Sequence, residues 1–336
     1  MLHDFGGNMG FYGKINTVNT QPGIALTSVN STMVGTGVTP EGINQNYMIY
    51  DFMLETGFTV HSVNVTNWLK EYTMRRYNTS SPEAIKTWNI LGNTIYNDTK
   101  PGFPSKSLIR GSPVKRPTLD NPGLPYWYQY SSLALAWDNF SQSLNTLKDL
   151  ETVRYDAVDI TRQMLQAVHR LLYYAMVEEF LWKRDPGKLG EQLLDLLDDF
   201  DKMLCSDAHF SMGKWIQDAK ILGTTAEEKD LYEYNARIQV TLWGPNGEIL
   251  DYASKHWCSL VKHYYRPRWA LFVSYLNHAY ATKSKFDHKA FASDVFTNVE
   301  EPFTKDRSVF PSTATGNAIE LAKDMYIKWR PFLNDV

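Results

Sequence analysis

The sequence is poor in cysteine and has no long uncharged apolar run, and both shortages narrow what it can encode. Cys205 and Cys258 are its only cysteines, which excludes the CxxC pairs of zinc and redox sites. They either form one disulfide or remain buried thiols, and we favour thiols because free cysteine is usually buried. No stretch reaches the roughly 18 apolar residues of a membrane span, so we expect no membrane contact.

An excess of one charge sign is also absent. The net charge is −3 and the isoelectric point is about 6.3, which excludes the strongly basic balance of nucleic-acid-binding proteins. Residues 1–7 contain neither a basic region nor an apolar region, so they are no signal peptide. The sequence therefore predicts a soluble chain without a nucleic-acid partner, and it leaves the oligomeric state open.

Cofactor and metal motifs are missing as well. There is no HExxH, no P-loop and no histidine cluster with metal spacing. Gly35 and Gly37 begin a dinucleotide-type pattern, but Pro40 stands where its third glycine is needed. We expect neither a metal nor a cofactor.

Two unlike parts follow each other along the chain. Residues 1–62 are rich in Gly, Asn and Thr, and we expect a buried strand over 31–37 and a helix over 44–57. Strand, loop and helix make one β/α unit, which is not a domain by itself. We interpret residues 1–62 as the remnant of an incomplete β/α barrel.

Helical patterns dominate from residue 63 onward. Ser81 and Thr225 are predicted helix N-caps, the latter with a capping-box glutamate, Glu228. Further helices are expected over 152–183, 189–204, 251–264, 268–282 and 316–329. Residues 98–130 carry six prolines and are expected to form a long ordered loop. The predicted fold is mainly α, with residues 63–336 forming one large all-α domain.

Candidate chemistry centres on a glutamate and on an aromatic pair. Glu41 follows a predicted strand at the mouth of a β/α unit, where barrel enzymes place catalytic carboxylates. The alternative is an ordinary loop glutamate, or a helix N-terminal acid favoured by the dipole. Trp243 and Tyr252 flank a Gly/Pro turn and could face a sugar ring, although such aromatics also pack into cores.

At these residues the sequence resembles glycoside hydrolase family 89, the α-N-acetylglucosaminidases, and the likeness covers the whole chain. The segments that carry it, in order, are Met1–Asn8, Asn30–Gly42, Arg75–Tyr77, Arg154–Asp156, Thr161–Gln163, Thr241–Pro245, Ile249–Tyr252 and Pro267–Trp269. The family fold is a small domain, a β/α barrel and an all-α domain, which agrees with the two-part interpretation.

The resemblance implies a role for individual residues. Glu41 matches the catalytic nucleophile of a retaining mechanism. The implied sugar-pocket residues are Leu2, Phe5, Trp243, Ile249 and Tyr252. Family substrates are glycans with a terminal, non-reducing α-linked N-acetylglucosamine, in animals chiefly heparan sulfate.

The resemblance also implies that the sequence is a fragment. A retaining glycosidase needs two carboxylates about 5–5.5 Å apart. The family's acid/base glutamate lies in an upstream segment, so we expect the chain to begin inside the barrel and to be inactive alone. Asp4 departs from the expected asparagine. The alternative function is a non-catalytic helical scaffold or weak sugar-binding module.

Location and glycosylation are inferred from sequons. Five candidate N-glycosylation sites occur, at Asn30, Asn64, Asn78, Asn97 and Asn139. With the resemblance they predict a lysosomal or secreted glycoprotein. Six basic residues could favour a sulfated polyanion, although scattered basic residues are usually surface features: Arg75, Arg76, Lys115, Arg116, Arg266 and Arg268.

Overall fold

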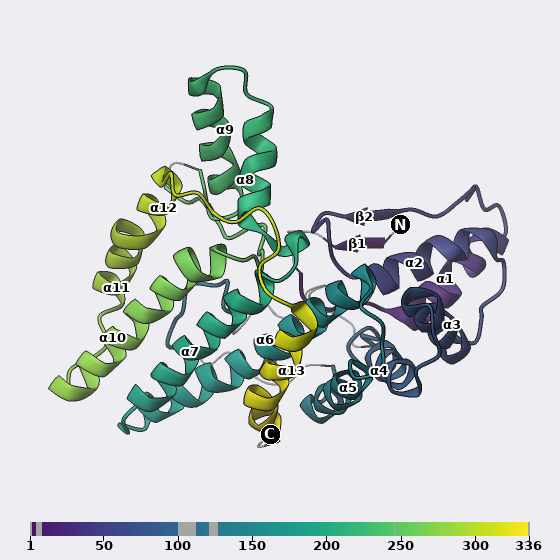
Figure 1. Cartoon of the computed structure of the whole chain (residues 1–336), viewed down its shortest axis with the longest axis horizontal. Helices are drawn as coiled ribbons and strands as arrows, with labels where there is room; N and C mark the ends of the chain where they lie inside the picture. Colours follow the sequence, from purple (N-terminus) through teal and green to yellow (C-terminus); the bar gives the residue numbers. More distant parts are fainter. Residues whose placement is uncertain (1, 5–8, 100–111, 121–126, 245, 335–336) are drawn as a thin grey trace. The chain divides into compact units, whose positions relative to one another are not determined.

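A computed structural model describes residues 2–4, 9–99, 112–120, 127–244 and 246–334, and it confirms the predicted mainly α class (Figure 1). The α-helices are α1 (Ile15–Thr27), α2 (Tyr47–Glu55), α3 (Val65–Tyr77), α4 (Pro82–Asn93), α5 (Tyr130–Ser143), α6 (Glu151–Leu181), α7 (Gly187–Leu204), α8 (Met212–Ile221), α9 (Ala226–Gln239), α10 (Arg266–Thr282), α11 (His288–Val295), α12 (Glu301–Lys305) and α13 (Ala318–Trp329). The strands are β1 (Leu2–Asp4), β2 (Val38–Pro40), β3 (Leu242–Trp243) and β4 (Ile249–Leu250). The 3-10 turns are η2 (Thr56–Phe58), η3 (Ala208–Phe210) and η6 (Arg330–Leu333), and the π-helical turns are η4 (Val261–Tyr265) and η5 (Phe296–Glu300).

The chain divides into two compact units. Unit 1 comprises residues 1–108, 124–164 and 326–336, and unit 2 comprises residues 109–123 and 165–325. The division falls inside α6, so this helix contributes residues to both units. The domain boundary expected between residues 62 and 63 stays a prediction.

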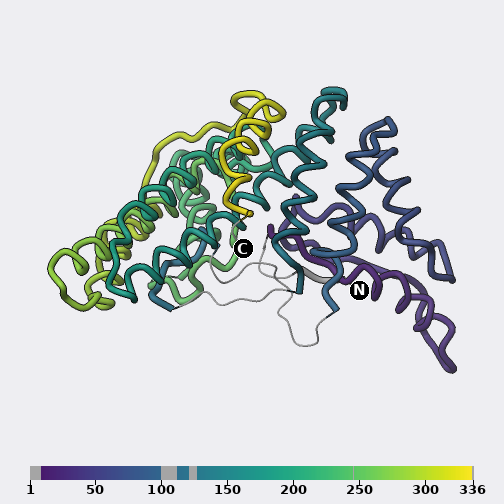
Figure 2. Tube along the Cα trace, turned by 90° about the horizontal axis from the view of Figure 1, so that it is seen from below, coloured from purple at the N-terminus to yellow at the C-terminus, as the bar shows by residue number. Residues whose placement is uncertain are grey.

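Unit 1 is built on a row of helices. Helices α3, α4 and α5 lie side by side (Figure 2). Their core is aromatic, since Tyr72 stacks on Trp68 at 5.3 Å and meets Trp88 edge-on at 5.4 Å between ring centroids. The predicted cap of α4 is confirmed, because the Ser81 side chain accepts a hydrogen bond from the Ala84 amide.

A buried carboxylate fixes this row of helices to α6. Asp156 accepts hydrogen bonds from Arg76 Nε at 2.5 Å and from the Tyr77 hydroxyl at 2.8 Å. Trp88 in turn donates its indole N–H to that hydroxyl at 2.9 Å. Asp156, Arg76, Tyr77 and Trp88 therefore satisfy one another's buried polar groups, as burial requires. Two of the family-like segments, Arg75–Tyr77 and Arg154–Asp156, thus have a structural role.

The strand expected over residues 31–37 is wrong. Residues 31–37 form no strand. The strand is β2, which begins directly after them at Val38 and pairs in parallel with β1. Strand formation here depends on a partner, and β1 offers its hydrogen-bonding edge only to residues 38–40. Helix α1 was also not predicted, because Pro22 lies inside it and its residues show little helical periodicity.

Unit 2 contains an antiparallel helical hairpin and a disulfide. Helices α8 and α9 pack together (Figure 1), and the capping box of Thr225 and Glu228 is confirmed. Cys205 and Cys258 form a disulfide, which corrects the expectation of two thiols. The reason is tertiary: Cys258 donates its amide to Phe210 O at 2.7 Å, next to the end of α7, where Cys205 lies.

The helices expected over 152–183, 189–204, 268–282 and 316–329 are confirmed as α6, α7, α10 and α13. The helix expected over 251–264 is wrong in its first part, because Asp251 has a positive φ of 53° and helical structure begins near residue 260. Residues 98–99, 112–120 and 127–129 contain no helix or strand, as expected for the proline-rich loop. In the described part of the chain, no helix combines the length and the apolar character that crossing a bilayer requires.

Candidate active site

Glu41 directly follows a strand of the small parallel sheet in unit 1. The register pairs Leu2 with Val38 and Asp4 with Pro40, so both strands end at the same edge. Loops at the carboxyl edge of parallel strands are where β/α enzymes carry catalytic groups. Leu2 belongs to β1, whereas Phe5 lies outside the described residues.

A tight turn carries the Glu41 side chain at the surface. The Glu41 amide donates to Thr39 O at 3.1 Å, and the Ile43 amide donates to Pro40 O at 3.0 Å. Ile43 adopts a positive φ of 68°, an uncommon and strained conformation for a β-branched residue. Such strain persists only where the surroundings impose it.

The turn is anchored by one buried asparagine. Asn46 donates Nδ2 to Gly10 O at 3.2 Å and accepts the Tyr12 amide at 3.3 Å. From α6, the Tyr155 hydroxyl donates to Asn44 O at 3.2 Å. The backbone around Glu41 is therefore fixed by contacts inside unit 1.

In unit 2, a short hairpin brings the predicted aromatic pair together. Strands β3 and β4 pair Trp243 with Ile249, and the Trp243 and Tyr252 rings meet edge-on at 5.7 Å. Exposed fractions of 37% for Trp243, 47% for Ile249 and 38% for Tyr252 leave their apolar surface accessible. The turn needs Gly247, which has a φ of 73° and whose Cβ would lie 2.4 Å from Leu242.

A buried ion cluster supports this hairpin. Asp251 accepts two hydrogen bonds from Arg268, both at 2.9 Å, and its amide donates to Thr241 O at 2.9 Å. Arg268 Nε lies 2.9 Å from Glu300, which also pairs with Arg116. Burial raises the pKa of Asp251, and the Arg268 charge opposes that rise. Two cations and two anions make the cluster neutral, which reduces the cost of burying it.

Sequence reasoning did not identify this cluster as a support. A signal was present, because Asp251 and Arg268 lie in two family-like segments, Ile249–Tyr252 and Pro267–Trp269. Nothing in the sequence marks Glu300, which reaches the cluster from η5.

The six basic residues suggested to favour a sulfated polyanion make contacts within the protein, and the suggestion stays a prediction. Arg76, Arg116 and Arg268 pair with buried carboxylates, and Arg266 pairs with Asp198 at 2.7 Å. These guanidinium groups neutralise charges of the protein itself. Arg75 forms an ion pair with Glu55, and Lys115 donates a hydrogen bond to the backbone oxygen of Asp251.

The five sequons differ in accessibility. Asn30, Asn64 and Asn78 are exposed and Asn97 is half-buried. Asn139 is 8% exposed within α5, where its Nδ2 donates to Leu135 O at 2.6 Å. A glycan on that nitrogen would have to displace this hydrogen bond and the surrounding packing.

In the described residues, one cluster has the spacing of metal ligands, but two of its three ligand atoms are joined in a disulfide. Ligand atoms of Asp201, Cys205 and Cys258 lie within 4.8 Å of one another. Both sulfur atoms belong to the disulfide, so one carboxylate remains. Asp201 instead accepts the Ser259 amide at 2.7 Å and the Lys262 amide at 3.0 Å, at the start of η4.

Comparisons with known proteins agree with the two-part sequence pattern. Residues 68–328 match the α-N-acetylglucosaminidase C-terminal domain, and residues 1–60 match the α-N-acetylglucosaminidase TIM-barrel domain. Human α-N-acetylglucosaminidase is 37% identical over 335 residues, covering 98% of this chain and 44% of the human protein. This chain thus spans less than half of that relative.

Solved structures of a bacterial protein have the same fold. A family 89 glycoside hydrolase from Clostridium perfringens, in complex with 2-acetamido-1,2-dideoxynojirmycin, superposes with a TM-score of 0.84 at 27% identity. That alignment covers 98% of this chain and 39% of the bacterial chain. A variant with two glutamates replaced by glutamine, in complex with its substrate GlcNAc-α-1,4-galactose, gives a TM-score of 0.85 at 26% identity and covers 98% and 38%.

Proposed function

The chain belongs to the α-N-acetylglucosaminidase family, glycoside hydrolase family 89, and we propose that it supplies the nucleophile and part of the sugar pocket of an exoglycosidase. The substrate is a glycan that ends in a non-reducing α-linked N-acetylglucosamine. The observation that carries this proposal is Glu41, at the carboxyl end of β2 and inside the segment that matches the barrel domain.

The proposed reaction is a double displacement with retention. The Glu41 carboxylate attacks the anomeric carbon, the bond to the glycosidic oxygen breaks, and a carboxylic acid protonates the leaving oxygen. Water, deprotonated by the same acid/base residue, then cleaves the glycosyl ester and regenerates Glu41. The resemblance assigns the acid/base role to a glutamate in a segment of the family's barrel that residues 1–60 do not match. The glutamine variant of the bacterial relative, changed at two glutamates, supports a pair of carboxylates.

The exposed apolar patch on unit 2 is proposed to contact the sugar, with Leu2 and Phe5 contributing from the barrel. Trp243 offers an aromatic face to the C–H surface of the ring, while Tyr252 adds a hydroxyl for hydrogen bonding. The buried cluster fixes the backbone at Asp251, the residue before Tyr252, and the two rings contact each other edge-on.

We further propose heparan sulfate as the physiological glycan and a lysosomal or secreted location. The disulfide supports an oxidising compartment, because such bonds rarely persist in the cytosol. Exposed Asn30, Asn64 and Asn78 support glycosylation in that compartment.

The proposal is tested with a chromogenic α-N-acetylglucosaminide at about pH 4.5–5, where one carboxylate of a pair is ionised and the other protonated. The 336-residue chain is assayed beside a protein extended to the length of its relatives. We expect hydrolysis with retention by the extended protein only. An extended protein that binds N-acetylglucosamine without hydrolysing it would instead indicate a sugar-binding module.

A further inference from the structure

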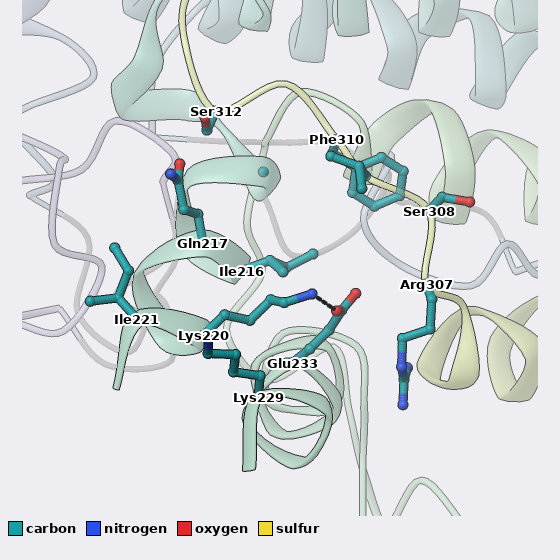
Figure 3. Close-up of a pocket in the computed structure, with 12 residues that line it drawn as sticks. Ile216, Gln217, Lys220, Ile221, Lys229, Glu233, Arg307, Ser308, Phe310 and Ser312 are labelled. Carbon is teal, nitrogen blue, oxygen red and sulfur yellow. Dashed lines mark hydrogen bonds and ion pairs between the residues drawn. The ribbon is translucent and has the colours of Figure 1, made fainter. Parts of the chain in front are cut away.

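A second pocket lies in unit 2, between helices α8 and α9 and residues 307–312 (Figure 3). Its volume is about 400 Å³, within the range of small-ligand sites. None of the residues assigned to the sugar pocket lines it. The function proposed above therefore does not explain this pocket.

The wall formed by residues 307–312 is held firmly. Ser211 donates its hydroxyl to Pro311 O at 2.6 Å, and Arg237 donates to Ser308 O at 3.0 Å. Gly213 allows the close approach, because a Cβ there would lie 2.2 Å from Pro311 O. The pocket is thus formed before any ligand arrives, which lowers the entropy cost of binding.

The acidic residue of the pocket, Glu233, is already neutralised by a buried arginine. Glu233 is buried and accepts two hydrogen bonds from the buried Arg237, at 2.8 and 3.1 Å. Burial would raise the pKa of Glu233, but hydrogen bonds from Lys220 and Arg237 lower it below its usual value. The carboxylate is therefore ionised and paired, and it contributes little net negative charge to the pocket.

Three cations remain around the opening. Lys220 contacts Glu233 at 2.5 Å, and its side chain is 37% exposed. Lys229 and Arg307 are exposed, and neither lies within ion-pair distance of a carboxylate of the described residues. Figure 3 shows Lys220 and Lys229 on the helical side and Arg307 on the opposite segment. Because Glu233 is already paired, the net charge around the opening is positive, which favours an anionic ligand.

The rest of the lining is mixed. Ile216 and Phe310 are nearly buried and form an apolar surface, while Gln217, Ser308 and Ser312 carry hydrogen-bonding groups. A bare anion would interact only with the cations of the pocket. A sugar that carries an anionic group would also place C–H faces against the apolar surface and hydroxyl groups near the polar side chains.

We infer that this pocket binds a sugar residue carrying a sulfate or carboxylate group, as a second glycan-binding site of the chain. The positive charges of Lys229 and Arg307 attract the anionic group, and Gln217 and Ser312 offer hydrogen bonds to the sugar hydroxyls. The preference for an anion rests on the pocket alone, and the choice of a sugar as its carrier rests on the proposed function.

The test is calorimetric titration of the 336-residue chain with a sulfated glucosamine–uronate disaccharide, the desulfated disaccharide and inorganic sulfate. We expect the sulfated disaccharide to bind at least about tenfold more tightly than the desulfated disaccharide or inorganic sulfate. The double variant Lys229→Gln with Arg307→Gln should lower its affinity by about tenfold. Lys214→Gln, an exposed lysine on α8 that does not line the pocket, is the matched control and should change affinity less than about twofold.

Three results would overturn the inference. Equal binding of the disaccharides, or binding unchanged in the double variant, would exclude an anion site in this pocket. Sulfate that binds as tightly as the sulfated disaccharide would exclude the sugar. Failure of the proposed function is separate, because hydrolysis of the neutral chromogenic glycoside by the extended protein does not involve Lys229 or Arg307.

Discussion

The Glu41 turn in unit 1 and the Trp243–Tyr252 hairpin in unit 2 are supported in different ways. Glu41 projects from an exposed turn, and apolar side chains of the same region remain uncovered, with exposed fractions of 100% for Val34 and 93% for Phe58. The Trp243–Tyr252 hairpin instead rests on the buried pair of Asp251 and Arg268. The Glu41 region therefore exposes apolar surface, whereas the hairpin is backed by a buried ion pair. The hairpin is complete within unit 2. Mutations should therefore separate loss of chemistry from loss of folding.

The largest effect is expected at Glu41. In the extended protein, Glu41→Gln should lower kcat by about 10⁴-fold or more, because the nucleophile is removed while the turn geometry is retained. The midpoint of thermal unfolding should stay unchanged, since the side chain is exposed. Glu71→Gln, at an exposed glutamate of α3, is the control and should leave both measurements unchanged. A fully active Glu41→Gln enzyme would refute the assignment.

Removing Arg268 should destabilise unit 2. Arg268→Met leaves Asp251 and Glu300 buried with too little positive charge, and we expect a loss of about 3–5 kcal/mol in the free energy of unfolding. Urea unfolding measures this loss. Arg184→Met, which breaks the exposed pair with Glu179, should cost under about 1 kcal/mol. Equal losses in both variants would mean that the buried cluster is not a support.

The disulfide should contribute somewhat less. Replacing Cys205 and Cys258 by alanine opens a loop of 53 residues and should cost about 2–4 kcal/mol. The same loss should appear when the unchanged chain is unfolded under reducing conditions. If reduction leaves the free energy of unfolding unchanged, the stability of unit 2 does not depend on this disulfide.

Asp201 should make unit 2 more stable in acid. Burial raises its pKa from 3.8 to about 6, so between these pH values the folded state binds a proton that the unfolded state releases. The stabilisation is complete below about pH 4 and is lost as the pH rises through 6, a change of roughly 3 kcal/mol. Asp201→Asn should flatten this part of the profile in urea unfolding. Asp230→Asn, at an exposed residue of α9, should not.

The smallest effect is expected at the aromatic pair. Trp243→Ala should raise KM for the chromogenic glycoside about tenfold with a smaller change in kcat, because the ring is proposed to contact bound sugar. Trp182→Ala removes an indole that is 69% exposed elsewhere in unit 2 and should leave KM unchanged. Equal KM values in the two variants would remove Trp243 from the sugar pocket.

Local signals predicted most of the helices. The caps at Ser81 and Thr225 form as expected, because a cap depends on residues within one turn of the helix. Strand 38–40 and the Asp251 turn were misplaced, since a strand requires a partner and a buried carboxylate requires a cation from far along the chain. Such partners are not visible in a local pattern.

The sequence by itself determined the mainly α class and the family, because these depend on local periodicity and on matching segments. Only the tertiary structure decided that Cys205 and Cys258 pair, that Asp251 and Arg268 form a buried ion pair, and that Lys229 and Arg307 line a common pocket. Each of these contacts joins residues that are distant in the chain. Their energies come from burial and charge pairing, which arise only once the helices have packed.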